Sequence, residues 1–466
     1  CNSALRVLNA ATDEQVNGRV SRIAEMKVLR AHYYFELSRL FNKIPYFDEN
    51  VEISQYPDIP NNEFTRDEIL SMLAKEMLDA AEQLPASQPE VGRIHKYIAL
   101  AYAAKIKLYQ AYQQDETTHA VTSINKELLR EVVSLCDQVT ASNRYGLLDD
   151  FQGLDLVANE NGKESVFTMN DGTESAGRIN WSNLLNSPGG GSPYGGDGFF
   201  LPSQDLINAY QTDANGLPDF NYQSKSDYSW AVLNNGVYTL QNTTPNVDPR
   251  LDFVVGRPTI TWKTYPDKPC EGWVRDKETY GYNCAKRFWV SPESSDMFNG
   301  WPWGASQLNW QIIRYADILL WKAEALIELN EGDGLETARD LINQIRNRAR
   351  NSAYVKDFND HSKYAANYLV NPYPADVWNQ DYARQALRWE TRLEKALEGE
   401  RFFDLVRWGI VETTMNKYIT AESDNRIYYA NAHFTGGKDE YYPVPNNQYG
   451  FSGGKYVQNP GYAPFN

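Results

Sequence analysis

Apolar residues recur every three to four positions in two separate blocks of this 466-residue chain, and this spacing constrains the fold more than any other feature. It is the spacing of a helix that buries one face. No uninterrupted apolar run approaches the ~18 residues of a membrane-spanning helix, so we expect these helices to bury their apolar faces against one another. The predicted helices are residues 20–41, 65–84, 92–112, 126–142, 308–330, 335–350 and 382–408.

The ends and the pairing of these helices are indicated by single residues. Thr65 and Glu68 have the spacing of a capping box, which predicts a helix start. Ala325 and Ala338 lie on either side of a tight turn at residues 330–334, where an antiparallel helix pair needs small side chains. This two-helix unit resembles a tetratricopeptide repeat. The sequence therefore predicts a mostly α protein built on a tetratricopeptide-like helical scaffold.

The helical spacing fades between residues 151 and 306, where glycine and proline cluster. Strand-like runs occur there at residues 165–169, 253–255 and 259–262. We therefore predict three parts that form one integrated domain. They are an N-terminal helical part (1–150), a loop-rich insert with a few short strands (151–306), and C-terminal helices with an irregular tail (307–466).

Charge and aromatic content narrow the classes of ligand. Acidic residues outnumber basic ones, 61 to 45, which gives a formal net charge of −16. A polyanion of this kind has no electrostatic reason to bind phosphate backbones, so nucleic-acid binding is disfavoured. Aromatic residues make up 13 % of the chain, with 31 Tyr and 12 Trp, which is more than core filling alone explains.

The cysteines and histidines predict no cofactor and no metal. None of the four Cys belongs to a Cys-x-x-Cys pair, and the five His show no zinc-ligand spacing. No Asp-x-Asp-x-Asp loop indicates a bound Ca²⁺. Cys136 lies on an apolar helical stretch, which is typical of a buried thiol. Cys270 and Cys284 bracket a short loop, and both a disulfide and two free thiols stay open for them, because the sequence does not supply their Cα distance.

Cys1 stands where the acylated cysteine of a mature lipoprotein would stand. However, Leu5, Leu8 and Ala11 follow it at helical spacing, whereas a lipid anchor is normally followed by a polar tether. We therefore expect the chain to start inside or just before a helix, and we do not expect Cys1 to be the anchor.

Several segments, in order along nearly the whole chain, resemble the motifs of the SusD/RagB family. Residues 24–41, followed by Ile44-Pro45, resemble its first signature helix. The other matching segments are Asp248-Pro249-Arg250, Ile313-Arg314, Ala323-Glu324-Ala325, Asn343, Arg346, Glu390, Arg392, Glu394, Glu398-Gly399, Arg401, Asp404-Leu405, Arg407, Pro443-Val444-Pro445 and Gln458–Tyr462. Asn42, Thr391 and Lys395 depart from the family pattern. These departures concern local packing and not the resemblance to the family.

This resemblance implies a specific biology. Such proteins are lipid-anchored on the outer face of the outer membrane in Bacteroidetes and lie like a lid over a SusC-like, TonB-dependent barrel. They hold oligosaccharides, or peptides in the RagB branch, deliver them to the barrel and carry no catalysis. In this family the first signature helix lies well inside the mature protein, so the resemblance implies a lipidated Cys upstream of residue 1.

The carboxylates at 390–398 allow two interpretations. Glu390, Glu394 and Glu398 lie at helical spacing, and a pair of them could perform acid–base catalysis on a glycosidic bond. Alternatively, they form ion pairs with neighbouring arginines and tie helices together. Interleaved arginines oppose the raised pKa that a catalytic acid needs, so we predict ion pairs and no enzyme activity. The predicted partners are Arg392, Arg401 and Arg407.

Tryptophan is concentrated at and beyond residue 181, and much of it lies in the insert. Trp262 lies in a strand-like run and is predicted to be core. Tryptophans in loops differ, because a rigid exposed indole can stack on the apolar face of a sugar ring. The predicted core tryptophans on helical patterns are Trp310, Trp321, Trp389 and Trp408. The predicted ligand-binding residues are Trp301, Trp303, Trp273, Trp289, Trp181 and Tyr194.

Together these features predict a cell-surface protein that captures an oligosaccharide and delivers it to a SusC-like TonB-dependent transporter. A peptide-binding, RagB-like lid of the same kind of transporter is the alternative, and the loop tryptophans favour sugar over peptide. An all-helical glycoside hydrolase is the third hypothesis, which lacks a convincing pair of carboxylates.

Overall fold

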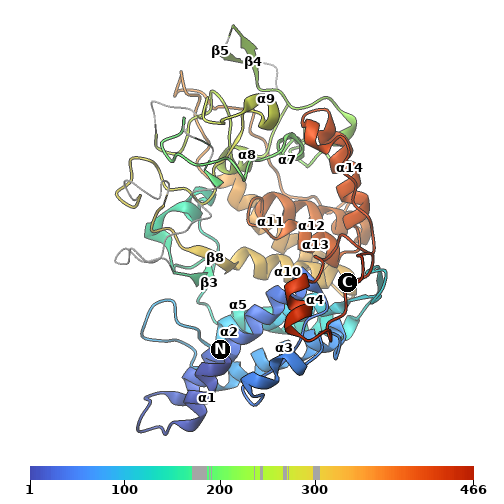
Figure 1. The fold of residues 1–466 in the computed structure, drawn as a ribbon. Helices are drawn as coiled ribbons and strands as arrows, with labels where there is room; N and C mark the ends of the chain where they lie inside the picture. Colours follow the sequence, from blue (N-terminus) through green and yellow to red (C-terminus); the bar gives the residue numbers. More distant parts are fainter. Residues whose placement is uncertain are drawn as a thin grey trace.

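The computed structural model describes residues 1–170, 186–187, 189, 191–235, 237–241, 245–265, 270, 272–297 and 305–465. Helices from both ends of the chain form a stack, and the loop-rich insert lies beside it (Figure 1). The N-terminal helices are α1 (Asn2–Ala10), α2 (Arg19–Phe41), α3 (Arg66–Gln83), α4 (Lys96–Ala111) and α5 (Lys126–Ala141). The C-terminal helices are α10 (Tyr315–Leu329), α11 (Gly334–Asn351), α12 (Gln380–Glu394), α13 (Arg401–Arg407), α14 (Val411–Ser423) and α15 (Asn446–Phe451).

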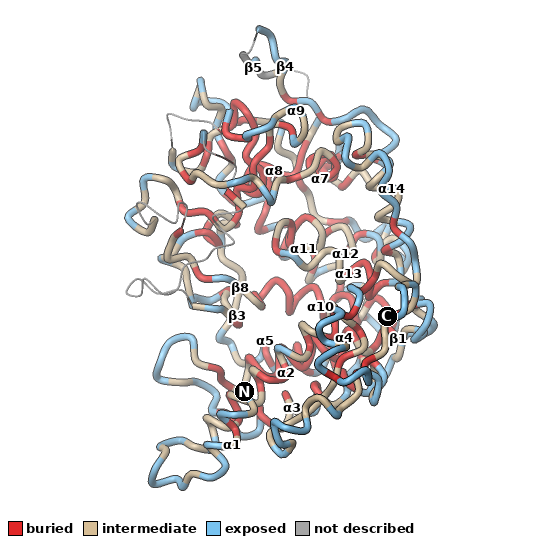
Figure 2. Tube along the Cα trace, viewed as in Figure 1, coloured by how far each residue is buried: buried red, intermediate tan, exposed pale blue. Residues whose placement is uncertain are grey.

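The helices of the two halves share one hydrophobic core. In the N-terminal half α2 packs on α3, α3 on α4 and α4 on α5. Helix α5 then packs on α10, which the insert separates from it in sequence, and α10 packs on α11 and α12. Figure 2 shows buried residues along α10 and α5. Ala99, Ala103 and Ala104 are completely buried on α4 because their small side chains let neighbouring helices approach closely.

The predicted mostly α scaffold is confirmed, and so are several of its details. The Thr65 hydroxyl accepts a hydrogen bond from the Glu68 N–H at 3.3 Å, and the Glu68 carboxylate accepts one from the Thr65 N–H at 2.8 Å. Ala325 and Ala338 are both completely buried in the α10–α11 pair. In the described part of the chain, no helix combines the length and the apolar character that crossing a lipid bilayer requires.

Among the described residues, strands occur only as antiparallel pairs. Such pairs are marginal on their own, so side-chain packing must hold the insert in shape. The pairs are β1 (Tyr112–Gln114) with β2 (Val121–Ile124), β3 (Ser165–Met169) with β8 (Trp310–Arg314), β4 (Ala231–Asn234) with β5 (Val237–Leu240), and β6 (Val255–Gly256) with β7 (Cys284–Ala285). The short helices and 3-10 turns are η1 (Ile53–Asp58), η2 (Phe151–Asp155), η3 (Val157–Asn159), α7 (Gln204–Ala209), η4 (Tyr222–Ser224), α8 (Arg250–Val254), α9 (Lys277–Tyr280) and η5 (Ile427–Tyr429).

Two predicted helices were wrong in their limits. The predicted helix at 308–330 begins as strand β8, because its first residues pair with β3, and α10 starts only at Tyr315. The predicted helix at 382–408 is broken into α12 and α13. Leu397 and Gly399 lie between them with φ of 66° and 83°, in the left-handed region that ends a right-handed helix.

Of the three predicted strands, only residues 165–169 are confirmed, as β3. Residues 253–255 instead belong to the end of α8 and the start of β6. Residues 259–262 form only isolated bridges at Ile260 and Trp262. Short apolar runs do not distinguish a strand from a buried turn or helix end, which explains these errors.

Candidate functional site

A buried network of charged side chains joins segments that lie far apart in the sequence. The Arg250 guanidinium donates to Glu390 Oε1 at 2.5 Å and to Asp248 Oδ2 at 2.7 Å. Arg314, at the end of β8, donates to Glu394 Oε1 at 2.6 Å. All five side chains are completely buried. The network therefore ties α8, β8 and α12 together beneath the surface.

The prediction that the glutamates form ion pairs is confirmed, but the predicted partners were wrong. Residues two positions apart on a helix face different directions, so Glu390 does not meet Arg392. Arg392 instead pairs with Asp205, and Arg407 pairs with Glu324. Arg401 donates to the Arg388 carbonyl oxygen at 3.4 Å. The partners of the three glutamates are Arg250, Arg287, Arg314, Arg346, Arg348 and Lys395.

This pairing keeps the carboxylates of Glu394 and Glu398 ionised. Burial alone would raise the pKa of Glu394, but Arg348, Arg314 and Arg250 together lower it to about 2. Burial also acts to raise the pKa of Glu398, but its own cationic partners lower it overall. A glycosidase needs one carboxyl group that is still protonated near neutral pH. Glu394 and Glu398 therefore cannot act as the general acid in this arrangement.

Three of the six predicted ligand-binding residues are buried in a second feature, an aromatic cluster. Tyr194 is completely buried, and Trp273 and Trp289 are each 3 % exposed. The Tyr194 ring lies 5.1 Å from that of Trp289, and its hydroxyl donates to the Val290 carbonyl at 2.6 Å and accepts from Trp262 Nε1 at 2.9 Å.

The position of these three rings corrects the prediction that they form a stacking platform. A platform needs a free ring face, and these faces are covered by neighbouring aromatic rings. Trp262, predicted to be core, is indeed completely buried in the same cluster. The other three predicted residues, Trp181, Trp301 and Trp303, lie outside the described residues.

The aromatic cluster also contains the two cysteines for which a disulfide was an open alternative. Cys270 and Cys284 are completely buried and are free thiols in this structure. Burial, followed by a hydrogen bond with Cys270, raises the pKa of the Cys284 thiol well above its usual value. The fold thus brings the two side chains together without a bond between them.

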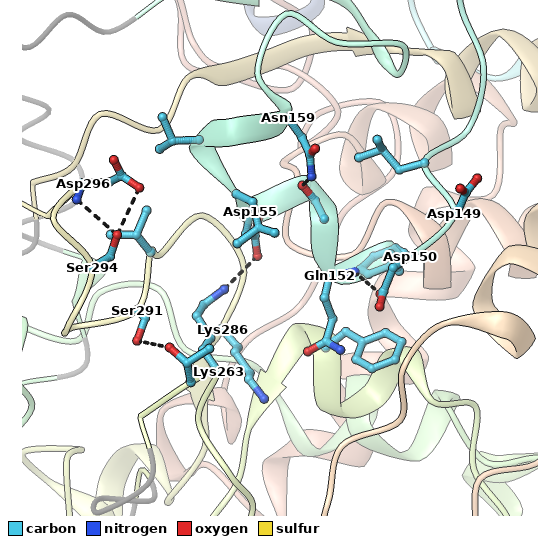
Figure 3. A pocket seen from close by; sticks show the side chains of 18 of the residues that line it. Asp149, Asp150, Gln152, Asp155, Asn159, Lys263, Lys286, Ser291, Ser294 and Asp296 are labelled. Atoms are coloured by element: carbon cyan, nitrogen blue, oxygen red, sulfur yellow. Dashed lines mark hydrogen bonds and ion pairs between the residues drawn. The ribbon is translucent and has the colours of Figure 1, made fainter.

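A pocket of about 960 Å³ opens in the insert, within the usual size range of small-molecule sites of ~300–1,000 Å³. Its walls come from η2, η3, the turn at 263–264 and the loop at 286–296 (Figure 3). Hydroxyl and amide side chains line it beside apolar ones, and acidic groups outnumber the lysines. The polar and charged lining residues are Asp149, Asp150, Gln152, Asp155, Asn159, Lys163, Lys263, Thr264, Lys286, Ser291, Glu293, Ser294 and Asp296.

Asp155 is the charged centre of one pocket wall. It accepts hydrogen bonds from Lys263 Nζ at 3.0 Å and Arg287 Nε at 3.1 Å. Burial acts to raise the pKa of Asp155, but Lys263 and Arg287 lower it overall. Burial lowers the pKa of Lys286 to about 8, although its ammonium group donates to two backbone carbonyls at 2.7 and 2.9 Å. The wall is therefore rigid and its charges are largely compensated.

An aromatic pair of a half-buried Phe288 and an exposed Trp310 stands next to this wall, and the sequence analysis missed it. The Phe288 N–H donates to Asp155 Oδ1 at 3.2 Å, and its ring lies 4.6 Å from that of Trp310. Trp310 is 36 % exposed at the start of β8, so the prediction that it is core was wrong. The sequence contained a sign of this exposure. Trp310 begins a short run that is compatible with a strand, and the ends of strands are often exposed.

Comparison with known proteins identifies the family. The model of the SusD family matches residues 163–462, which is more than half of the chain. The chain belongs to the SusD family. The range matched to the SusD family contains the ion network around Arg250 and Arg314 as well as Trp310.

Individual SusD-like proteins are similar over most of this chain. A SusD-like protein of Bacteroides ovatus is 21 % identical over 432 residues, which cover 87 % of this chain and 63 % of that protein, so the chain spans less than two thirds of its length. A SusD superfamily crystal structure from Bacteroides vulgatus has a TM-score of 0.69 at 20 % identity, covering 99 % of this chain and 82 % of that one. Surface glycan-binding protein A from Bacteroides fluxus has a TM-score of 0.66 at 22 % identity, covering 99 % and 82 %. These structures show that the chain has the SusD-like, tetratricopeptide-like helical fold.

Proposed function

We propose that this protein binds neutral oligosaccharides on the face that carries the pocket and the Phe288–Trp310 pair. The observation that carries the proposal is the combination of a roughly saccharide-sized hollow, rich in hydroxyl, amide and carboxylate groups, with an exposed indole beside it. Sugar hydroxyls match the polar lining, and the apolar face of a sugar ring matches an indole. The similarity to a surface glycan-binding protein supports the same class of ligand.

The wider role that we propose is capture and delivery. The protein acts at the cell surface, held by a lipid anchor, and passes its glycan unchanged to a SusC-like, TonB-dependent barrel. Membership of the SusD family supports this role. The engagement of Glu394 and Glu398 in ion pairs supports binding without hydrolysis. Co-purification of this chain with the barrel, and the absence of released reducing ends, would test the two parts separately.

Trp301 and Trp303 remain candidates for ligand binding on the basis of sequence. Their Trp-Pro-Trp turn is flanked by glycines, and proline stiffens the backbone between the two rings. We expect replacement of both by alanine to weaken glycan binding while the melting temperature changes by no more than a few degrees. A large loss of stability would show that the rings are core instead. Trp181 is a further candidate of this kind.

The binding experiment compares matched aromatic variants. Wild-type protein is titrated with starch, laminarin, xylan, mannan and inulin oligosaccharides, and binding is followed by calorimetry and tryptophan fluorescence. Trp310→Ala should lower the affinity about tenfold, because it removes one stacking partner. Phe451→Ala removes a ring that is 51 % exposed on α15 and should leave binding unchanged. Binding of peptides, with no response to any glycan class, would replace this proposal by the peptide alternative.

A further inference from the structure

A patch of tyrosines lies where α9 meets the segment after α14. Tyr280, at the end of α9, is 44 % exposed, and Tyr428, in η5, is 50 % exposed. Their rings lie 6.1 Å apart. Tyr429 lies 4.6 Å from Tyr428, and Tyr418 of α14 lies 5.5 Å from Tyr429. We call these four residues the tyrosine patch. None of them lines the pocket, and Figure 1 shows α9 and α14 at the end of the molecule away from α1.

The groups beneath the tyrosine patch hold it in one position. Gly281 follows Tyr280 with φ of +75°, and a Cβ there would lie 2.3 Å from Arg426 Nη2, so only glycine lets Arg426 pack against this turn. Glu422 of α14 is buried and accepts a hydrogen bond from the Asp205 N–H at 2.5 Å, which joins α14 to α7. A surface that is already ordered loses little conformational freedom when it binds a ligand.

The charges at the tyrosine patch indicate an uncharged occupant. Arg426 and Glu422 act on Tyr428, and Lys277 and Glu278 precede Tyr280 in α9, so these four charged side chains carry no net charge. The whole chain carries a formal net charge of −16, which disfavours binding of an anionic polymer. Exposed phenol rings, by contrast, provide both a face that stacks on a sugar ring and a hydroxyl that hydrogen-bonds to it.

We propose that the tyrosine patch is a second contact site for a neutral polysaccharide, separate from the pocket. The proposal rests on the proposed function, because the pocket supplies the first contact. A chain long enough to touch both sites gains from the high effective concentration of the second contact once the first has formed. An oligosaccharide that only fills the pocket gains nothing from the patch.

The test compares long and short forms of the same glycan. Laminarin, pullulan and xylan are each paired with their trisaccharide, and affinities are measured for wild type, Trp310→Ala, Tyr280→Ala/Tyr428→Ala and the control Tyr442→Ala, a ring that is 61 % exposed elsewhere. The double variant should lose about three- to tenfold in affinity for the polysaccharide and nothing for the trisaccharide. Tyr428→Phe should restore most of the stacking. Backbone hydrogen exchange of residues 424–430 should slow with the polysaccharide only.

Each outcome bears on one proposal or the other. If the double variant binds the polysaccharide as tightly as Tyr442→Ala does, the second contact is refuted, whereas trisaccharide binding that depends on Trp310 leaves the proposed function standing. If the double variant loses polysaccharide and trisaccharide equally, the patch is not a separate site. If it changes only the affinity for a partner protein, the patch is a protein interface. If no glycan binds wild type, both proposals fail together.

Discussion

Two regions of the molecule hold distant segments together by different chemistry. Completely buried ion pairs around Arg250 and Arg314 hold α12 against α8 and β8. Packed rings around Tyr194 hold part of the insert, which also contains the buried ion pair of Asp252 with Arg257. A buried charge tolerates no loss of its partner, whereas a ring at the edge of a packed cluster can turn toward solvent. The ion pairs also leave Glu394 and Glu398 without the raised pKa that a catalytic acid needs.

The comparison is tested most severely by removing one buried cation. Arg314→Ala removes one cationic partner from each of the buried Glu164, Glu394 and Glu398, and breaking a buried ion pair costs ~3–5 kcal/mol. We expect a large drop in the free energy of unfolding, measured by urea denaturation, or a failure to fold. The exposed Arg130, which pairs with Glu331, provides the control, and Arg130→Ala should leave the denaturation midpoint where it is. Equal effects of the two variants would contradict the role of the network.

The second prediction separates a tryptophan of the insert from the tryptophan that begins β8. Trp289→Ala removes a ring that is 3 % exposed and should destabilise the protein by about 3–5 kcal/mol, because it leaves a cavity in the aromatic cluster. Trp310→Ala removes a ring that is 36 % exposed and should change the melting temperature by a few degrees at most. Thermal unfolding followed by circular dichroism measures both. The opposite order of effects would mean that Trp310 is the packing residue.

Acid should weaken the ion pairs of Glu394. The pKa of Glu394 is lowered to about 2 in the folded protein, against an ordinary value of 4.5. Its contribution to stability is therefore complete above about pH 4.5 and is lost as the pH falls through about 2. We expect the melting temperature of wild type to fall over this range. Glu394→Gln should be less stable at pH 7 and should show a shallower fall, and an identical pH profile for the two proteins would disprove this origin.

The smallest expected effect concerns the cysteines of the insert. Refolding with oxidised glutathione should join Cys270 and Cys284 in a disulfide, with two glutathione thiols released, and raise the melting temperature by a few degrees. The completely buried thiols of the folded protein should resist the same reagent, because it cannot reach them. Thiol titration after denaturation should give four reactive thiols before refolding and two afterwards. Four thiols in both samples would show that the pair does not bridge.

Local features of the sequence were sufficient for most of the scaffold. The capping box at Thr65 and the small residues Ala325 and Ala338 depend on neighbours a few positions away, so they could be predicted correctly. The pairing of charges at Glu390 and Glu394 could also be predicted as a tendency, because an unpaired buried carboxylate is too unfavourable to occur.

The identities of the partners and the exposure of each ring could be decided only by the tertiary structure. Glu390 meets Arg250 across 140 residues, and no periodicity reports a contact at that separation. Trp273 and Trp289 are enclosed, whereas Trp310 is exposed. The physical reason is that burial depends on which distant segments fold over a side chain, and that choice is made by the packing of the whole chain.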